Sequence, residues 1–261
     1  MDRVRRFLPN VKVIHTNYFR LTAEEDNCVF TLTIGSSVTT SDYLYIEYSV
    51  DEGENWTRTY NVNNSTIKIT MPSINTNESV IFKGVGRQMG NYYTNASYYS
   101  QFKSNDKKFS VSGVLMALLK GEFSDKDTSM DETTEYSFRT LFENTKVTHA
   151  DKLIMPPNVT KDCFNQMFKG CTLLVSAPLL QAKTIVHGCY KRMFSGCTNL
   201  NYIKMLATEL TNLPTVSDNA TYEWLKNVSS TGTFDKNRYA TWTKRGADGV
   251  PTNWTINLVD P

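Results

Sequence analysis

A twelve-residue pattern occurs twice in the second half of the chain, and this repeat constrains the fold more than any other feature. Cys163–Leu174 and Cys189–Leu200 align at a shift of 26 residues, with both cysteines, the Met-Phe pair and Gly-Cys-Thr in the same places. A degenerate copy precedes them, with Phe138, Leu141-Phe142 and Asn144-Thr145 at the matching positions. A fixed period of this kind predicts that successive units stack and bury the same positions against one another.

Each unit is expected to hold one short strand and one short helix. The strands are predicted at Leu153-Ile154 and Leu179-Leu180, and the helices at the Cys-Phe/Tyr-x-x-Met-Phe segments. Gly170 and Gly196 stand where each predicted helix must end, which is a common place for a C-cap glycine. A period of 26 residues lies within the range of leucine-rich repeats. We therefore predict a short leucine-rich-repeat solenoid over residues 136–204.

The repeat cysteines fit a buried column better than a zinc site or disulfides, which are the alternatives. Cysteine is small and behaves as an apolar side chain when buried. Structural zinc sites use CxxC pairs, whereas the spacing here is C-x7-C-x17-C-x7-C. The total of five cysteines is odd, which argues against a disulfide framework. Structural repeat roles are assigned to Cys163, Phe168, Cys171, Cys189, Phe194 and Cys197.

The residues before the repeat read as short strands. Apolar and polar residues alternate in Cys28–Ile34, Leu44–Val50 and Thr66–Thr70, and Val80–Phe82 is a shorter apolar run. Alternation with period 2 predicts one buried face and one wet face. The segments between are rich in turn-forming residues, and no helical pattern separates the strands. This favours an immunoglobulin-like β-sandwich over residues 18–112.

The remaining segments complete a mainly β fold with short helices. Residues 1–17 form a basic N-terminal arm, and residues 113–135 form a connector, whose first part belongs to a stretch, Val111–Lys120, that reads as a short helix or a buried connector. Residues 205–261 form a C-terminal cap, because an open stack would expose its core. The tryptophans of this cap are expected in its core, and stacking of one of them on a glycan is the alternative. These residues are Trp224, Trp242 and Trp254.

The segment Ser49–Trp56 matches the Asp-box pattern S-x-D-x-G-x-x-W. Asp51 can accept hydrogen bonds from amides across the turn, Gly53 can adopt a positive φ, and Trp56 can pack back on the hairpin. Sialidase propellers carry one such box per blade, but a single copy in a short region favours a hairpin staple over a sugar-cleaving role.

A tyrosine cluster lies between small polar residues at positions 91–99. Exposed tyrosines in such a setting would form a contact surface for sugars or proteins. The favoured interpretation is a strand-loop-strand whose tyrosines alternate in and out of the core. The candidate surface aromatics are Tyr92, Tyr93, Tyr98 and Tyr99.

No catalytic or cofactor motif stands out in the sequence. The three histidines, His15, His149 and His187, lack the spacing of metal-binding pairs, and no P-loop, Rossmann or G-x-S-x-G fingerprint occurs. A net charge of +2 argues against a nucleic-acid-binding surface, and no apolar run reaches the ~20 residues of a membrane span. We expect no enzyme activity, no catalytic residue, no cofactor, no metal, no nucleic-acid partner and no membrane insertion.

The basic arm predicts an assembly anchor. Arginine supplies forked hydrogen bonds to carboxylates, and neighbouring apolar residues supply burial in a groove of an acidic partner. A frayed terminus is the alternative. No apolar leader follows the basic cluster, so export by an encoded signal peptide is not expected. The candidate anchor residues are Arg3, Arg5, Arg6, Phe7 and Leu8.

The repeat resembles a known family. Cys189–Thr198, with Ser176–Leu180 before it, is similar to the BspA-type leucine-rich repeats of gut Bacteroidales, in which an L-x-x-A-P-x-L-P strand precedes C-Y-x-x-M-F-x-G-C-T. This chain departs from the pattern at Gln181–Lys183, which replaces P-A-T, and it has few repeats. The tail resembles the C-terminal cap of those proteins, and the front half resembles the β-domain that often precedes their repeats.

The resemblance implies a binding or structural module. Similar chains are bacterial surface adhesins and structural proteins of Bacteroides-infecting phages, including crAss-like phages. We expect a virion fibre or surface-decoration protein, assembled in the host cytoplasm and displayed on the virion surface. Its partners would be capsid or tail proteins, further copies of itself, and a host glycan or protein. The alternative is a bacterial cell-surface adhesin that binds glycan or protein.

Overall fold

Strands dominate the computed structural model, and the prediction of a mainly β chain is confirmed. The structure describes residues 17–35, 38, 43–60, 66–86, 89–90, 99–121, 128–131, 134–210 and 219–261. Within these residues the strands are β1 (Phe19–Ala23), β2 (Phe30–Ile34), β3 (Tyr43–Ser49), β4 (Thr57–Tyr60), β5 (Ile67–Thr70), β6 (Ser79–Gly86), β7 (Gln101–Ser104), β8 (Phe109–Val114), β9 (Val147–Ile154), β10 (Tyr202–Met205), β11 (Thr233–Asn237) and β12 (Thr255–Val259), and a short helix, α1, spans Ala117–Lys120.

Two sheets pack face to face in the first half of the chain. The larger sheet has the order β4-β3-β6-β1-β8-β9, and the smaller has the order β5-β2-β7. Phenylalanine rings from both sheets meet between them. Phe19 stacks on Phe102 with 5.4 Å between ring centroids, and Phe30 meets Phe109 edge-on at 5.2 Å. The alternation seen in the sequence therefore directs one face of each sheet into a shared core.

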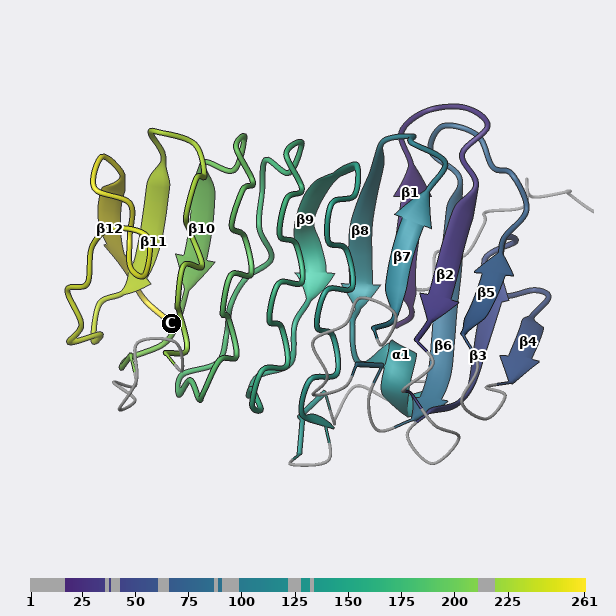
Figure 1. The fold of residues 1–261 in the computed structure, drawn as a ribbon, viewed down its shortest axis with the longest axis horizontal. Coiled ribbons are helices and arrows are strands. Elements are labelled where there is room, and N and C mark those ends of the chain that lie inside the picture. The colour runs from purple at the N-terminus through teal and green to yellow at the C-terminus, as the bar shows by residue number, and fades with distance from the viewer. Residues whose placement is uncertain are drawn as a thin grey trace, which may run out of the picture.

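The larger sheet continues into the second half of the chain. β9 pairs with β8 in parallel, across the segment where the sequence places the connector. Single bridges then join His149 to Ser176 and Ser176 to Tyr202, and β10, β11 and β12 follow in parallel. Figure 1 shows this ladder running along the long axis of the molecule, from β4 at one end to β12 at the other.

The repeated segments form consecutive turns, so the helices predicted there are wrong. Positive φ recurs at every fourth residue, at Asp162, Gln166 and Gly170, with values of 51°, 61° and 73°. Some amides close turns within a unit, whereas the Phe168 amide donates to the Met193 carbonyl of the next unit at 2.9 Å. A left-handed residue at every fourth position interrupts an α-helix. Gly170 and Gly196 have the expected positive φ, but as turn residues rather than helix caps.

The degenerate copy and one further unit belong to the same stack. The Phe138 amide donates to the Cys163 carbonyl at 2.9 Å, as the equivalent Phe164 amide donates to Cys189 at 3.0 Å. A later unit follows that the sequence repeat did not reveal, and the Phe194 amide donates to its Trp224 carbonyl at 3.0 Å. Equivalent positions in neighbouring units are joined by ion pairs. Glu143 and Lys169 lie 26 residues apart, whereas Arg192 and Glu223, which link to the later unit, lie 31 residues apart. The longer connection hides the period.

Aromatic columns join the two halves into one core. Phe142, Phe168 and Phe194 stack with centroid distances of 5.3 and 5.7 Å. The Phe142 ring also lies 5.8 Å from Phe102 of β7, almost parallel to it. A second column runs through Phe138, Phe164 and Tyr190. The face-to-face sheets therefore close one end of the stack.

All five cysteines are buried free thiols, and four of them, Cys163, Cys171, Cys189 and Cys197, are those predicted to be buried in the repeat. The Cys171 thiol donates to the Phe142 carbonyl at 2.9 Å, and the Cys197 thiol donates to the Phe168 carbonyl at 3.0 Å. Thr145 stands at the equivalent position of the degenerate unit, but its hydroxyl donates to the Phe142 carbonyl of its own unit at 2.8 Å. Burial raises the pKa of Cys171 to about 11. The position therefore requires a small side chain with a donor, which cysteine and threonine both provide.

Candidate ligand groove

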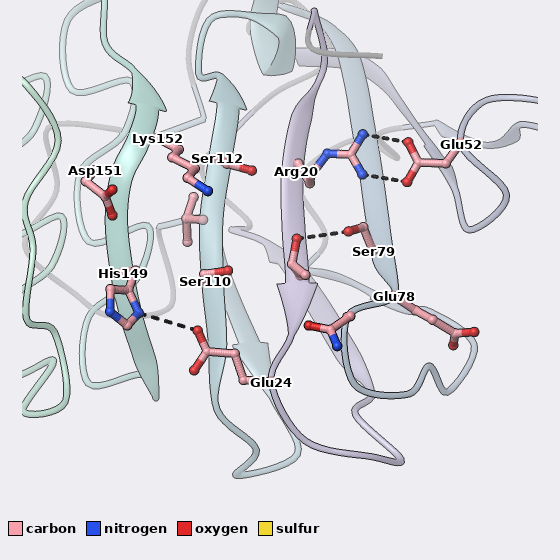
Figure 2. Close-up of a pocket in the computed structure, with 13 residues that line it drawn as sticks. Arg20, Glu24, Glu52, Glu78, Ser79, Ser110, Ser112, His149, Asp151 and Lys152 are labelled. Atoms are coloured by element: carbon pink, nitrogen blue, oxygen red, sulfur yellow. Dashed lines mark hydrogen bonds and ion pairs between the residues drawn. The ribbon is translucent and has the colours of Figure 1, made fainter. Parts of the chain in front are cut away.

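A groove of about 630 Å³ opens on the outer face of the larger sheet, where β6, β1, β8 and β9 lie side by side (Figure 2). Strand alternation places its residues there. Along β1, Phe19 and Leu21 turn into the core, so Arg20 and Thr22 turn outward. Ser110 of β8 does the same beside buried Phe109. The hydroxyl groups of the groove come from Thr22, Ser79, Ser110 and Ser112.

A buried ion pair forms one wall of the groove. Both terminal nitrogens of Arg20 donate to the carboxylate oxygens of Glu52, each at 2.6 Å. The two residues are only 9% and 8% exposed. Such a forked pair fixes the planes of both side chains. Loss of one partner would remove the forked counter-charge of the other buried group, which is costly.

The Asp-box hairpin holds Glu52 in this position. Asp51 accepts hydrogen bonds from the Ser49 hydroxyl at 2.6 Å and from the Asn55 amide at 2.9 Å. These bonds lower the pKa of Asp51 to about 2. Gly53 has a φ of 92°, and the Trp56 ring lies in contact range of the Cβ that any other residue would add there.

Trp56 also ties the hairpin to the rest of the outer face. Its ring is half-buried, meets Tyr18 edge-on at 5.0 Å and lies under the Lys83 ammonium at 4.2 Å. The sequence identified Asp51, Gly53 and Trp56 as a hairpin staple, and the geometry gives them that role beside the groove.

The opposite wall comes from β9. The Thr148 hydroxyl donates to Glu24 Oε1 at 2.6 Å, and His149 Nδ1 lies 3.5 Å from the same oxygen. Asp151 accepts a hydrogen bond from the Ser176 hydroxyl at 2.9 Å. The contacts of Glu24 therefore tie the residue that follows β1 to β9. Figure 2 shows His149, Asp151 and Lys152 facing Arg20 and Glu52 across the groove.

Negative charge predominates among the groove residues. Four carboxylates line it, against the cations of Arg20 and Lys152. The excess favours neutral or cationic ligands over anionic ones. In the described part of the chain, no three or more His, Cys, Asp or Glu residues come together as a metal site would require. The groove therefore offers a ligand hydroxyl and carboxylate groups for hydrogen bonding and a net negative charge.

The structure corrects one of the predicted surface aromatics. Tyr99 is only 7% exposed and lies beneath the Arg139 guanidinium, 4.7 Å from its ring centroid. Burial raises its pKa, and the residue is a core residue rather than a contact surface. Tyr92, Tyr93 and Tyr98 lie outside the described residues, as do the anchor candidates Arg3, Arg5, Arg6, Phe7 and Leu8.

The tryptophans near the C-terminal end are core residues, so the glycan-stacking alternative is wrong. Each ring is buried, and each indole N–H donates to a backbone carbonyl. Trp224 donates to Gly249 at 2.9 Å and Trp242 to Ala207 at 3.0 Å. Trp254 completes the set with a bond to Ser229 at 2.8 Å.

Comparison with known proteins returned no match: no family model, no curated protein and no solved structure matches the chain. Among the described residues, no helix has the length and apolar character to span a bilayer.

Proposed function

We propose that this chain is a non-enzymatic binding and structural protein, built from an immunoglobulin-like sandwich and a short, capped leucine-rich-repeat solenoid. We place it on a virion, as a fibre or surface-decoration protein that contacts a host surface. The 26-residue stacking, the shared aromatic core and the BspA-like repeat sequence support this assignment. A bacterial cell-surface adhesin is the alternative, supported by the same resemblance.

The groove on the continuous outer sheet carries the proposal. Its side chains project from neighbouring strands of one ladder, and two internal clamps, Arg20–Glu52 and Thr148–Glu24, fix its walls. Groups held on strands and locked by such bonds are preorganised, so less conformational entropy is lost when a ligand binds.

The ligand proposed for the groove is a neutral glycan. Hydroxyls of serine and threonine, the amide of Asn77 and the carboxylate of Asp151 all form hydrogen bonds with sugar hydroxyls. The excess of carboxylates disfavours sialylated or sulfated glycans. A virion protein and a surface adhesin would both use such a site, and antibody labelling of particles and of cells distinguishes the two settings.

The test is a glycan panel probed with the purified full chain. Binding to neutral glycans is expected, with at least tenfold weaker binding by Asp151→Ala. Asp106→Ala is the matched control, since that carboxylate is 85% exposed and lies outside the groove. Preference for acidic glycans, or equal binding by both variants, would refute the assignment.

A further inference from the structure

Within the described residues, β12 stands at the edge of the ladder. Among the described strands, β12 pairs with β11 on one side and with none on the other. The Thr255 amide donates to Gly232, and the Val259 carbonyl accepts from Arg238, so both residues turn their backbone groups toward the β11 side. Residues alternate in a parallel ladder. Ile256 and Leu258 therefore present their N–H and C=O groups at the open edge.

The inner face of this strand is apolar and incompletely covered. Ile256 lies opposite buried Phe234 and packs on the core, while Leu258 is 60% exposed. β12 carries no charged residue, proline or bulge, the features that usually protect an edge strand. The tail beyond it turns back toward β10, where Pro261 lines a hollow that Pro157 and Leu206 also line (Figure 1).

The opposite end of the ladder is a poor match for this edge. β4 is also an edge strand, but its residues are Thr57, Arg58, Thr59 and Tyr60. Its inward positions are threonines, since Thr57 and Thr59 lie opposite Tyr48 and Ile46. Pairing of β12 with β4 would set Ile256 and Leu258 against polar side chains. Pairing of β12 with another β12 sets apolar residues against apolar residues.

We propose that β12 is a homodimer interface, in which two copies pair their β12 strands antiparallel about a two-fold axis at Asn257. In this register Ile256 of each copy faces Leu258 of the other, and each such pair exchanges both of its N–H···O bonds. No like charges meet within the paired strands. The two ladders become one continuous sheet, with a groove on each half.

The register can be tested by cross-linking. The Cα atoms of a central, non-hydrogen-bonded antiparallel pair lie ~4.5 Å apart, which suits a disulfide. Asn257→Cys should therefore give a covalent dimer on mild oxidation, whereas Thr255→Cys, which lies opposite Val259 of the other copy, should not. The native cysteines are buried and leave the readout clear.

Sedimentation of the purified full chain tests the interface itself. A concentration-dependent dimer is expected, and Leu258→Pro should shift it to monomer by at least tenfold in dissociation constant, because proline removes an edge donor that the β11 ladder does not use. Leu258→Lys is a second disrupting variant, and Thr255→Ala is the matched control that still dimerises.

Three outcomes would overturn the proposal. The first is a wild-type chain that stays monomeric at hundreds of micromolar. The second is a dimer that survives both Leu258 variants, which places the interface elsewhere. The third is open-ended polymer growth abolished by Thr59→Pro in β4, which identifies head-to-tail pairing of β12 with β4.

Discussion

Phe142 should couple the stability of the two halves of the chain. Its ring is fully buried and lies within stacking range of Phe19 and Phe102 from the face-to-face sheets, and of Phe168 from the next unit. Truncation of a buried phenylalanine to alanine costs about 3–5 kcal/mol. Since several aromatic partners lose contacts at once, Phe142→Ala should fall near the top of that range, at about 4–5 kcal/mol.

Urea denaturation followed by circular dichroism measures this cost, and hydrogen exchange locates it. In the variant, β1–β8 and β9–β12 should lose protection together, because one core spans both. Phe194→Ala is the matched control, as its ring belongs to the same column and touches Phe168. It should destabilise the far units more than the sheets. A cost below about 2 kcal/mol, or opening of only one half, would refute the idea of a shared core.

Three further predictions concern local features. Arg20→Met should cost about 3–5 kcal/mol by removing the forked counter-charge of buried Glu52, whereas adding Glu52→Gln should recover part of that loss in thermal melts. Asp51, with a folded-state pKa of about 2 against about 3.9 unfolded, stabilises the hairpin above pH 4, and this contribution is lost as pH falls toward 2; Asp51→Asn should flatten that pH dependence of the melting temperature. The four repeat cysteines should react with iodoacetamide only on unfolding, as mass spectrometry would show, and rapid native labelling would contradict their burial.

Local patterns in the sequence singled out some of the strands, such as β2, β3 and β5, but not β10, β11 or β12, and they misjudged the turns of the repeat. Alternation identified β2 and β3 because each has one buried face. A leucine-rich-repeat unit of one strand and one helix predicts helices in the repeat segments, and apolar residues four apart, such as Cys163 and Met167, also fit a helix. Consecutive turns with a left-handed residue every fourth position produce the same spacing, so periodicity alone cannot separate the two structures.

The groove lay beyond sequence reasoning for a different reason. Its residues come from segments far apart in the chain, such as Arg20, Glu52 and His149. Each is an ordinary polar residue at an outward strand position, and nothing in the sequence states that β8 pairs with β9 in parallel. The Asp box was the local motif closest to the groove in the sequence. It identifies the hairpin that positions Glu52, but not the other residues of the groove.

The ladder also acts as a molecular ruler. Each added unit of 26 residues lengthens the sheet by one strand spacing, ~4.8 Å, and leaves both ends unchanged. Duplication or loss of a unit would therefore change the distance between the groove and the β12 edge in fixed increments, without any change in the residues of either surface. The length of the molecule can thus evolve separately from the residues of the groove.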